Sequence, residues 1–221
     1  MKKKNFNSWN LENNFYFHSS SSRLKKIITH YEIFKKTLNV KGSIIECGVF
    51  KGNSFNRLLL FRDLLKDSPS KKVFGFDVFG KFPIQKNKKD NKFAKKHNRI
   101  IGLGVNNKIL NQNLRKKGFK KFQLIKGKVE KTINLFLKKN KKLKISFLHL
   151  DLDVYAPTYY VLDKLYNRVS NGGVILLDDY GKIHGATKAT KDFFKNNQIK
   201  YKISSVIFDK KLKFIVKGKY L

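Results

Sequence analysis

Residues 146–180 read SFLHLDLDVYAPTYYVLDKLYNRVSNGGVILLDDY, and this stretch decides the predicted fold. It contains two apolar runs that each end in acidic residues, Asp151 and Asp153 after the first and Asp178 and Asp179 after the second. The whole chain has 15 acidic residues against 50 basic ones, so four acids at two strand ends are an unusual concentration. Crowded carboxylates repel one another unless a cation or proton offsets their charge, and hard divalent cations prefer oxygen ligands. The stretch therefore predicts an enzyme that uses a metal ion.

Strand and helix patterns alternate on both sides of this stretch. The expected strands are 44–48, 72–77, 122–126, 145–150 and 174–177, followed by two terminal strands near 200–208 and 212–217. Helices are expected over 23–38, after Gly52, and over 105–117, 132–137, 157–169 and 186–195. This order predicts an α/β fold with a mainly parallel sheet, helices on both faces and an antiparallel hairpin at one edge.

Two segments show no clear periodicity. Residues 1–19 are expected to form a loose arm or a capping segment, and residues 80–100, which are rich in Lys and Asn, are expected to form a loop or lid. We expect residues 1–40 to form an N-terminal arm and helix, and residues 41–221 to form the main domain.

Composition limits the class of protein. With 41% hydrophobic residues the chain has enough apolar side chains for a packed core, and no apolar run is long enough to span a bilayer. The N-terminus is basic, but no apolar segment follows it, so no signal peptide is expected. The single Cys47 excludes an internal disulfide and a cysteine-based zinc site, which favours a cytoplasmic protein.

The formal net charge of +35 raises the question of a polyanionic partner. Only six of the 50 basic residues are Arg, which leaves 50 − 6 = 44 Lys, and Arg is the residue that recognises bases and phosphates in bidentate fashion. A codon bias towards AT explains the abundance of Lys, Asn and Ile without a nucleic-acid partner. The positive field is still suited to attracting an anionic substrate.

A nucleoside-binding pattern follows the first predicted strand. Glu46-Cys47-Gly48-Val49-Phe50-Lys51-Gly52 leads into a helix, and glycines here allow a tight turn and close helix packing. Asp77 ends the next strand, where its carboxylate is placed to accept hydrogen bonds from a ribose diol. Neither the three-glycine dinucleotide pattern nor a P-loop is present.

Four segments together carry a family resemblance: IIECGVFKGNSF, FGFDVFGKFP, LIKGKVEKTI, and the block from Phe147 to Phe194. Over about residues 30–195 the chain resembles macrocin O-methyltransferases, which are class I S-adenosylmethionine-dependent enzymes that methylate sugar hydroxyls with Mg²⁺. The resemblance implies a seven-stranded Rossmann-like sheet. Two departures from the family pattern concern acceptor recognition. After the second-strand aspartate, Gly80 and Lys81 replace an acid followed by glycine, and after the DDYG motif Lys182 stands where the family often has a histidine.

The resemblance also implies site residues. The donor site would comprise Glu46, Gly48, Val49, Phe50 and Gly52 around the methionine part, Asp77 at the ribose, and Gly127, Lys128 and Val129 near the adenine. Asp151, Asp178 and Asp179 would bind Mg²⁺, with Asp151 and Asp178 counted as catalytic. The alternative is that these acids cap the helices that follow them.

Further roles stay open at this point. His97 is the only histidine in the segment that supplies the general base in relatives, and a solvated surface position is the alternative. His149, in mid-strand, is interpreted as a core residue, and His184 as a substrate contact. Asp153, Tyr155 and Tyr180 either line the acceptor site or have structural roles.

The leading hypothesis is a Mg²⁺-dependent O-methyltransferase acting on the hydroxyl of a nucleotide-sugar, glycolipid or glycosylated metabolite. One alternative is a nucleic-acid methyltransferase, although DLDVYAPT stands where an amine-methylation motif would follow the fourth strand. The other is a non-catalytic basic binding protein with a vestigial site. Assembly into a homo-oligomer is left open.

Overall fold

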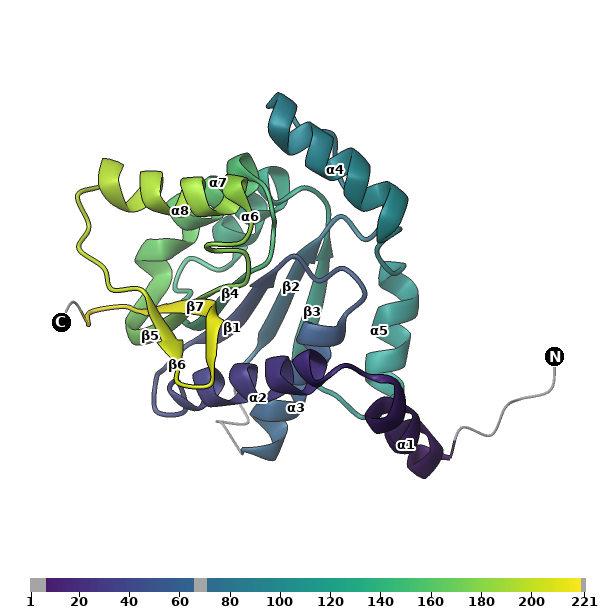
Figure 1. The fold of residues 1–221 in the computed structure, drawn as a ribbon. Helices are drawn as coiled ribbons and strands as arrows, with labels where there is room; N and C mark the ends of the chain where they lie inside the picture. Colours follow the sequence, from purple (N-terminus) through teal and green to yellow (C-terminus); the bar gives the residue numbers. More distant parts are fainter. Residues whose placement is uncertain (1–6, 66–70, 220–221) are drawn as a thin grey trace.

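The computed structural model describes residues 7–65 and 71–219, which form a seven-stranded sheet flanked by helices (Figure 1). The strands are β1 (Ser43–Cys47), β2 (Val73–Asp77), β3 (Phe122–Lys126), β4 (Ile145–Leu150), β5 (Val169–Leu177), β6 (Ser204–Val206) and β7 (Asp209–Val216). The helices are α1 (Ser8–His18), α2 (Ser21–Lys35), α3 (Asn53–Leu64), α4 (Lys88–Ile100), α5 (Asn107–Lys116), α6 (Val129–Lys139), α7 (Tyr155–Leu165), the 3₁₀ turn η1 (Tyr166–Arg168) and α8 (His184–Asn196).

The sheet has the strand order β3-β2-β1-β4-β5-β7-β6. Strands β1 to β5 are parallel, and β7 pairs antiparallel with both β5 and β6, so the expected mainly parallel sheet with an antiparallel C-terminal hairpin is confirmed. The order reverses at β1, between β2 and β4. Ligands bind beyond the carboxyl ends of the strands at such a switch point.

Both faces of the sheet are covered. Because successive side chains of a strand point to opposite faces, Ile45 packs with α6, α7 and α8 while its neighbour Ile44 packs with α2, α3 and α5 (Figure 1). The predicted N-terminal region contributes to this core, since Ile33 and Phe34 on α2 are fully buried. The proposed boundary near residue 40 stays a prediction.

Each of the two segments that showed no periodicity contains a helix, α1 (Ser8–His18) in the first and α4 (Lys88–Ile100) in the second. These helices correct the loose arm expected over 1–19 and the loop expected over 80–100 for the residues that they cover, and residues 1–6 lie outside the described part of the chain. Helix α4 begins after Asn87, whose side chain accepts hydrogen bonds from the backbone N–H groups of Lys89 and Asp90. Only Asp90 and Ala94 of α4 are buried, so the helix has no apolar stripe that a sequence pattern could reveal. Helix α1 has no buried residue, so it has no such apolar stripe either.

No helix within residues 7–65 and 71–219 combines the length and apolar character needed to cross a membrane.

Candidate active site

A cleft of about 550 Å³ lies at the carboxyl ends of β1, β2, β3 and β4, with residues of α4 on its far side. The predicted site residues that line it are Gly48, Phe50, Asp77, His97, Gly127, Lys128, Val129, Asp151, Asp153 and Tyr155. The predicted residues that do not line it are Glu46, Val49, Gly52, Asp178, Asp179, Tyr180 and His184. The donor and acid motifs, far apart in sequence, therefore share one cleft.

Gly48 allows the ends of β1 and β4 to approach. Its φ of +97° is unfavourable for other residues, and a Cβ built there would lie 1.7 Å from the carbonyl oxygen of Asp151. A side chain at residue 48 would therefore push the first metal-binding candidate away from the donor turn. Gly52, by contrast, lies against the Leu110 side chain of α5 rather than against the sheet or the cleft.

Asp77 organises the turn after β1. Its Oδ2 accepts hydrogen bonds from the backbone N–H groups of Val49 and Phe50, each at 2.9 Å, and its Oδ1 accepts one from Phe79 at 2.6 Å. A carboxylate that accepts several backbone N–H groups holds them firmly, because charge-assisted hydrogen bonds are stronger than neutral ones. Asp77 thus shapes the predicted donor loop from within, in addition to lining the cleft.

Three carboxylates converge where β4 and β5 end. The ligand atoms of Asp151, Asp153 and Asp179 all lie within 4.8 Å of one another, and Asp179 Oδ2 accepts a hydrogen bond of 2.9 Å from the Asp153 backbone N–H. Burial and then the neighbouring carboxylates raise the pKa of Asp153 and of Asp179 to about 7, and raise the pKa of Asp151 as well. The cluster repels added negative charge and favours a cation.

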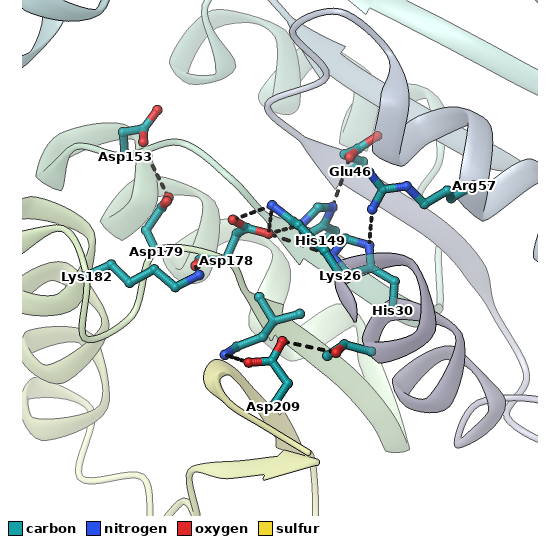
Figure 2. Close-up of polar contacts among 12 residues, drawn as sticks. Lys26, His30, Glu46, Arg57, His149, Asp153, Asp178, Asp179, Lys182 and Asp209 are labelled. Atoms are coloured by element: carbon teal, nitrogen blue, oxygen red, sulfur yellow. Dashed lines mark hydrogen bonds and ion pairs between the residues drawn. The ribbon is translucent and has the colours of Figure 1, made fainter. Parts of the chain in front are cut away.

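Asp178 faces away from this cluster (Figure 2). Lys26 Nζ of α2 lies 2.9 Å from each of its oxygens, and the Nε2 atoms of His149 and His30 lie 3.6 and 3.7 Å from Oδ1. Burial acts to raise the pKa of Asp178, but these basic neighbours lower it well below its usual range. The structure therefore groups Asp153, instead of Asp178, with Asp151 and Asp179.

Strand alternation explains this divergence. On each of three neighbouring strands, an apolar residue is followed two positions later by a polar one. The pairs are Ile44 and Glu46 on β1, Phe147 and His149 on β4, and Leu176 and Asp178 at the end of β5. Their apolar members pack on the α2 and α3 side, so Glu46, His149 and Asp178 point there as well. Asp179 points to the opposite side, with Asp153.

A buried polar network results on the α2 side (Figure 2). His149 Nδ1 lies 2.9 Å from Glu46 Oε1, and both side chains are fully buried. Burial acts to lower the pKa of His149, but the Asp178 and Glu46 carboxylates raise it to about 10, whereas burial lowers the pKa of His30 to about 3. His149 is therefore a charged link between two acids, a more specific role than that of a generic core residue. Glu46 contacts this network and not the cleft.

His97 lies on α4 and faces the cleft through an aromatic cluster. Its ring lies 5.3 Å from that of Phe50 and 5.1 Å from that of Phe82. Its Nδ1 is buried and has no hydrogen-bond partner among the described residues, and burial lowers the pKa of the ring. His97 is thus neither on a loose loop nor fully solvated.

Tyr155 is held at the start of α7. Its backbone N–H donates to Asp90 Oδ2 of α4 and its hydroxyl donates to Asp192 Oδ2, both at 2.9 Å. Tyr180 packs instead against the core, and His184 is exposed at the start of α8. Their predicted acceptor contacts stay predictions.

Sequence reasoning missed Lys26, His30 and Asp90, and also Arg57 of α3, whose Nη1 lies 3.5 Å from His30 Nδ1. Lys26 and His30 are four residues apart and share one face of α2, but among so many lysines nothing marked Lys26 as distinct. Asp90 carried a usable signal, since it is an acid within the Lys-rich 80–100 segment of a chain poor in acids.

The order of the strands and the position of the cleft define a class I methyltransferase. The sequence profile of the family described as macrocin-O-methyltransferase (TylF) matches residues 19–211. The chain belongs to this family, and it is accordingly an S-adenosylmethionine-dependent O-methyltransferase.

Solved structures agree with this fold. The O-methyltransferase NovP superposes with a TM-score of 0.76 over 88% of this chain and 80% of its own, at 21% identity. The calicheamicin methyltransferase CalS11 superposes with a TM-score of 0.75 over 98% of this chain and 88% of its own, at 18% identity. A second, apo structure of CalS11, a TDP-rhamnose 3′-O-methyltransferase, gives a TM-score of 0.70 at 18% identity over 98% of this chain and 89% of its own. No curated protein sequence matches the chain significantly.

Proposed function

We propose that the chain transfers the methyl group of S-adenosylmethionine to a hydroxyl of a sugar, with a Mg²⁺ ion at the acceptor. The observation that carries the proposal is the shared cleft, which Gly48 and Asp77 of the donor motif line together with Asp151 and Asp153. The structural likeness to CalS11, a TDP-rhamnose methyltransferase, supports a nucleotide-linked sugar as the acceptor class.

The donor would occupy the part of the cleft between the β1 turn and the β3 end. Phe50 and Asp77 border it on one side, and Gly127, Lys128 and Val129 on the other. Gly127 has a φ of +140° and donates its backbone N–H to the Asp77 carbonyl oxygen at 2.8 Å, which ties the two sides together. A donor held at both ends presents its methyl group in a fixed direction, which lowers the entropic cost of reaction.

The carboxylate cluster fits Mg²⁺. Oxygens about 2.1 Å from a Mg²⁺ ion lie roughly 3–4 Å from one another, which agrees with three acids whose ligand atoms lie within 4.8 Å. Asp151 and Asp179 belong to both candidate ligand sets, and the third member is Asp153 in the ligand-free geometry and Asp178 by family resemblance. When bound, the ion would act as a Lewis acid and template for the acceptor hydroxyl.

His97 is the proposed general base. The acceptor oxygen attacks the methyl carbon, the carbon–oxygen bond forms as the carbon–sulfur bond breaks, and the hydroxyl proton passes to the imidazole. Because burial lowers the pKa of His97, the ring is neutral near pH 7 and has a lone pair available. S-adenosylhomocysteine and the methylated sugar leave the site.

The charge of the cleft argues against nucleic acid as the acceptor. Five of its lining residues are acidic (Asp77, Asp90, Glu130, Asp151 and Asp153) and two are Lys (Lys86 and Lys128). A polyanion would meet these carboxylates at the reacting centre, so the net charge of the chain does not describe its active site.

The test is methyl transfer from labelled S-adenosylmethionine to a panel of nucleotide-sugars and lipid-linked glycans. We expect labelled product with Mg²⁺, loss of product with a chelator, and no product from Asp151→Asn. Transfer that is unchanged by the chelator would refute the metal, and incorporation into RNA or DNA alone would refute the sugar.

A further inference from the structure

A second cavity lies at the opposite end of the sheet from the active cleft. It has a volume of about 1070 Å³ and is lined by residues 38–43, 71, 72, 74 and 138–144, a set that we call the lysine bowl. These segments precede or begin β1, β2 and β4, whereas the cleft lies beyond the carboxyl ends of the same strands. The bowl is therefore a separate feature of the molecule.

The bowl concentrates positive charge well beyond the average of the chain. Among the described residues, 16 line the bowl; eight of these are Lys and none is acidic, whereas Lys makes up 44 of all 221 residues. The active cleft has the opposite bias, with five acids and two Lys among its lining residues. Codon bias explains a high lysine content, but it does not explain why charge is segregated between the two ends of one sheet.

Most of these lysines have no protein partner. The seven at positions 41, 72, 138, 139, 141, 142 and 144 are exposed, and within residues 7–65 and 71–219 none of them forms an ion pair. Lys217 lies close enough to Lys144 of the bowl to feel its positive charge, since burial and then Lys144 lower the pKa of Lys217. The positive charge therefore extends beyond the residues that line the bowl. Like charges held this close are stabilised when an anion binds between them.

The lining indicates the class of anion. The described part of the bowl contains no Arg, and Phe74, the one aromatic residue there, is 5% exposed, so these residues offer neither bidentate contacts to bases nor a ring for stacking. Lys ammonium groups act as compact point charges that suit phosphate oxygens. We propose that the lysine bowl binds a compact polyanion carrying several phosphate groups.

Isothermal titration calorimetry with inorganic tripolyphosphate tests this site. The buffer contains no Mg²⁺, and S-adenosylmethionine is saturating so that the cleft is filled. The bowl variant is K138Q/K141Q/K142Q/K144Q, and the matched control is K200Q/K202Q/K210Q/K211Q. Both variants remove four charges at exposed positions. We expect wild type and control to bind with similar affinity, and the bowl variant to bind at least tenfold more weakly.

Several outcomes would overturn the proposal. If the wild-type protein does not bind tripolyphosphate at low salt, the site is refuted. An equal loss of affinity in both variants would mean that binding reflects only the general positive charge of the protein. A single-stranded RNA 15-mer that requires the bowl lysines while tripolyphosphate does not would assign the bowl to nucleic acid. If the bowl variant does not fold, the extent of chemical acetylation at each lysine of the wild-type protein is compared with and without tripolyphosphate. Protection from acetylation that is confined to the lysines of residues 138–144 supports the site, and equal protection of all exposed lysines refutes it.

Discussion

Asp77 shapes the turn after β1, and ribose binding is a second, proposed role that would use the same oxygens. Its carboxylate accepts three backbone N–H groups, two of them from the turn that would frame the donor. A ribose diol would have to share these oxygens. The residue therefore couples the shape of the β1 turn to donor binding.

Replacing Asp77 with Asn should weaken S-adenosylmethionine binding by about 1–3 kcal/mol, because the amide keeps the size of the side chain but loses the charge-assisted hydrogen bonds. Calorimetric titration of the donor measures this. Asp63→Asn, on the outer side of α3, is the control and should bind like wild type. An unchanged affinity in D77N would refute both roles.

The third metal ligand can be identified by comparing two isosteric variants. Asp178 is already neutralised by Lys26 and His149, whereas Asp153 lies with Asp151 and Asp179. We expect D153N to weaken Mn²⁺ binding at least tenfold and D178N to weaken it less, as followed by electron paramagnetic resonance. The reverse order would restore the ligand set implied by the family and would mean that Lys26 moves when the ion binds.

His97→Ala should slow methyl transfer by about two to four orders of magnitude, because a positioned base is lost from the cleft. Donor affinity measured by calorimetry should change far less. His18→Ala, at the exposed end of α1, is the control and should turn over at the wild-type rate. A full-rate H97A enzyme would leave the imidazole a packing role against Phe50 and Phe82.

At the scale of elements, α2 links the N-terminal region to the catalytic edge of the sheet. Its inner face carries Lys26 against Asp178, Thr29 against Asp209, and His30 in the buried network. The contacts of Lys26 and Thr29 join α2 to residues more than 150 positions away in sequence. The helix is therefore a structural part of the site.

Lys26→Met should destabilise the metal-free protein by about 1–3 kcal/mol, since Asp178 loses an ion-pair partner while it stays buried. The cost is smaller than for a fully buried pair because Lys26 still reaches solvent. Urea denaturation measures the change. In the double variant K26M/D178N more than half of the loss should be recovered. Equal instability of the single and double variants would show that Lys26 acts through packing alone.

Helix α4, like α1, is an element whose type was predicted wrongly. Its sequence, KKDNKFAKKHNRI, offers a good N-cap but almost no apolar positions, because the helix covers a cleft and not the core. Strands β3 and β4 were predicted at their observed ranges because both show their character locally. Strand β4 is buried throughout, whereas the edge strand β3 alternates buried Phe122 and Leu124 with exposed Gln123. Burial pattern predicts elements of the core well and elements over a site poorly.

At the scale of the whole molecule, the fold separates charge that the sequence mixes. The net charge of +35 suggests one uniform positive field, yet five of the chain's 15 acids line the active cleft, and no acid within residues 7–65 and 71–219 lines the lysine bowl. An anionic acceptor would find its attraction in a bound metal ion and not in the walls of the cleft. The two ends of the sheet therefore suit different ligands.

The sequence by itself determined the α/β class, the parallel sheet, the family, and the strand ends at which the site lies, because these follow from local periodicity and from short motifs. Only the tertiary structure decided which acids meet: Asp178 turns to Lys26 and His149, Asp179 turns to Asp153, and Glu46 leaves the cleft altogether. Adjacent residues of a strand point to opposite faces of the sheet, and what each side chain meets there depends on helices that lie far away in the sequence.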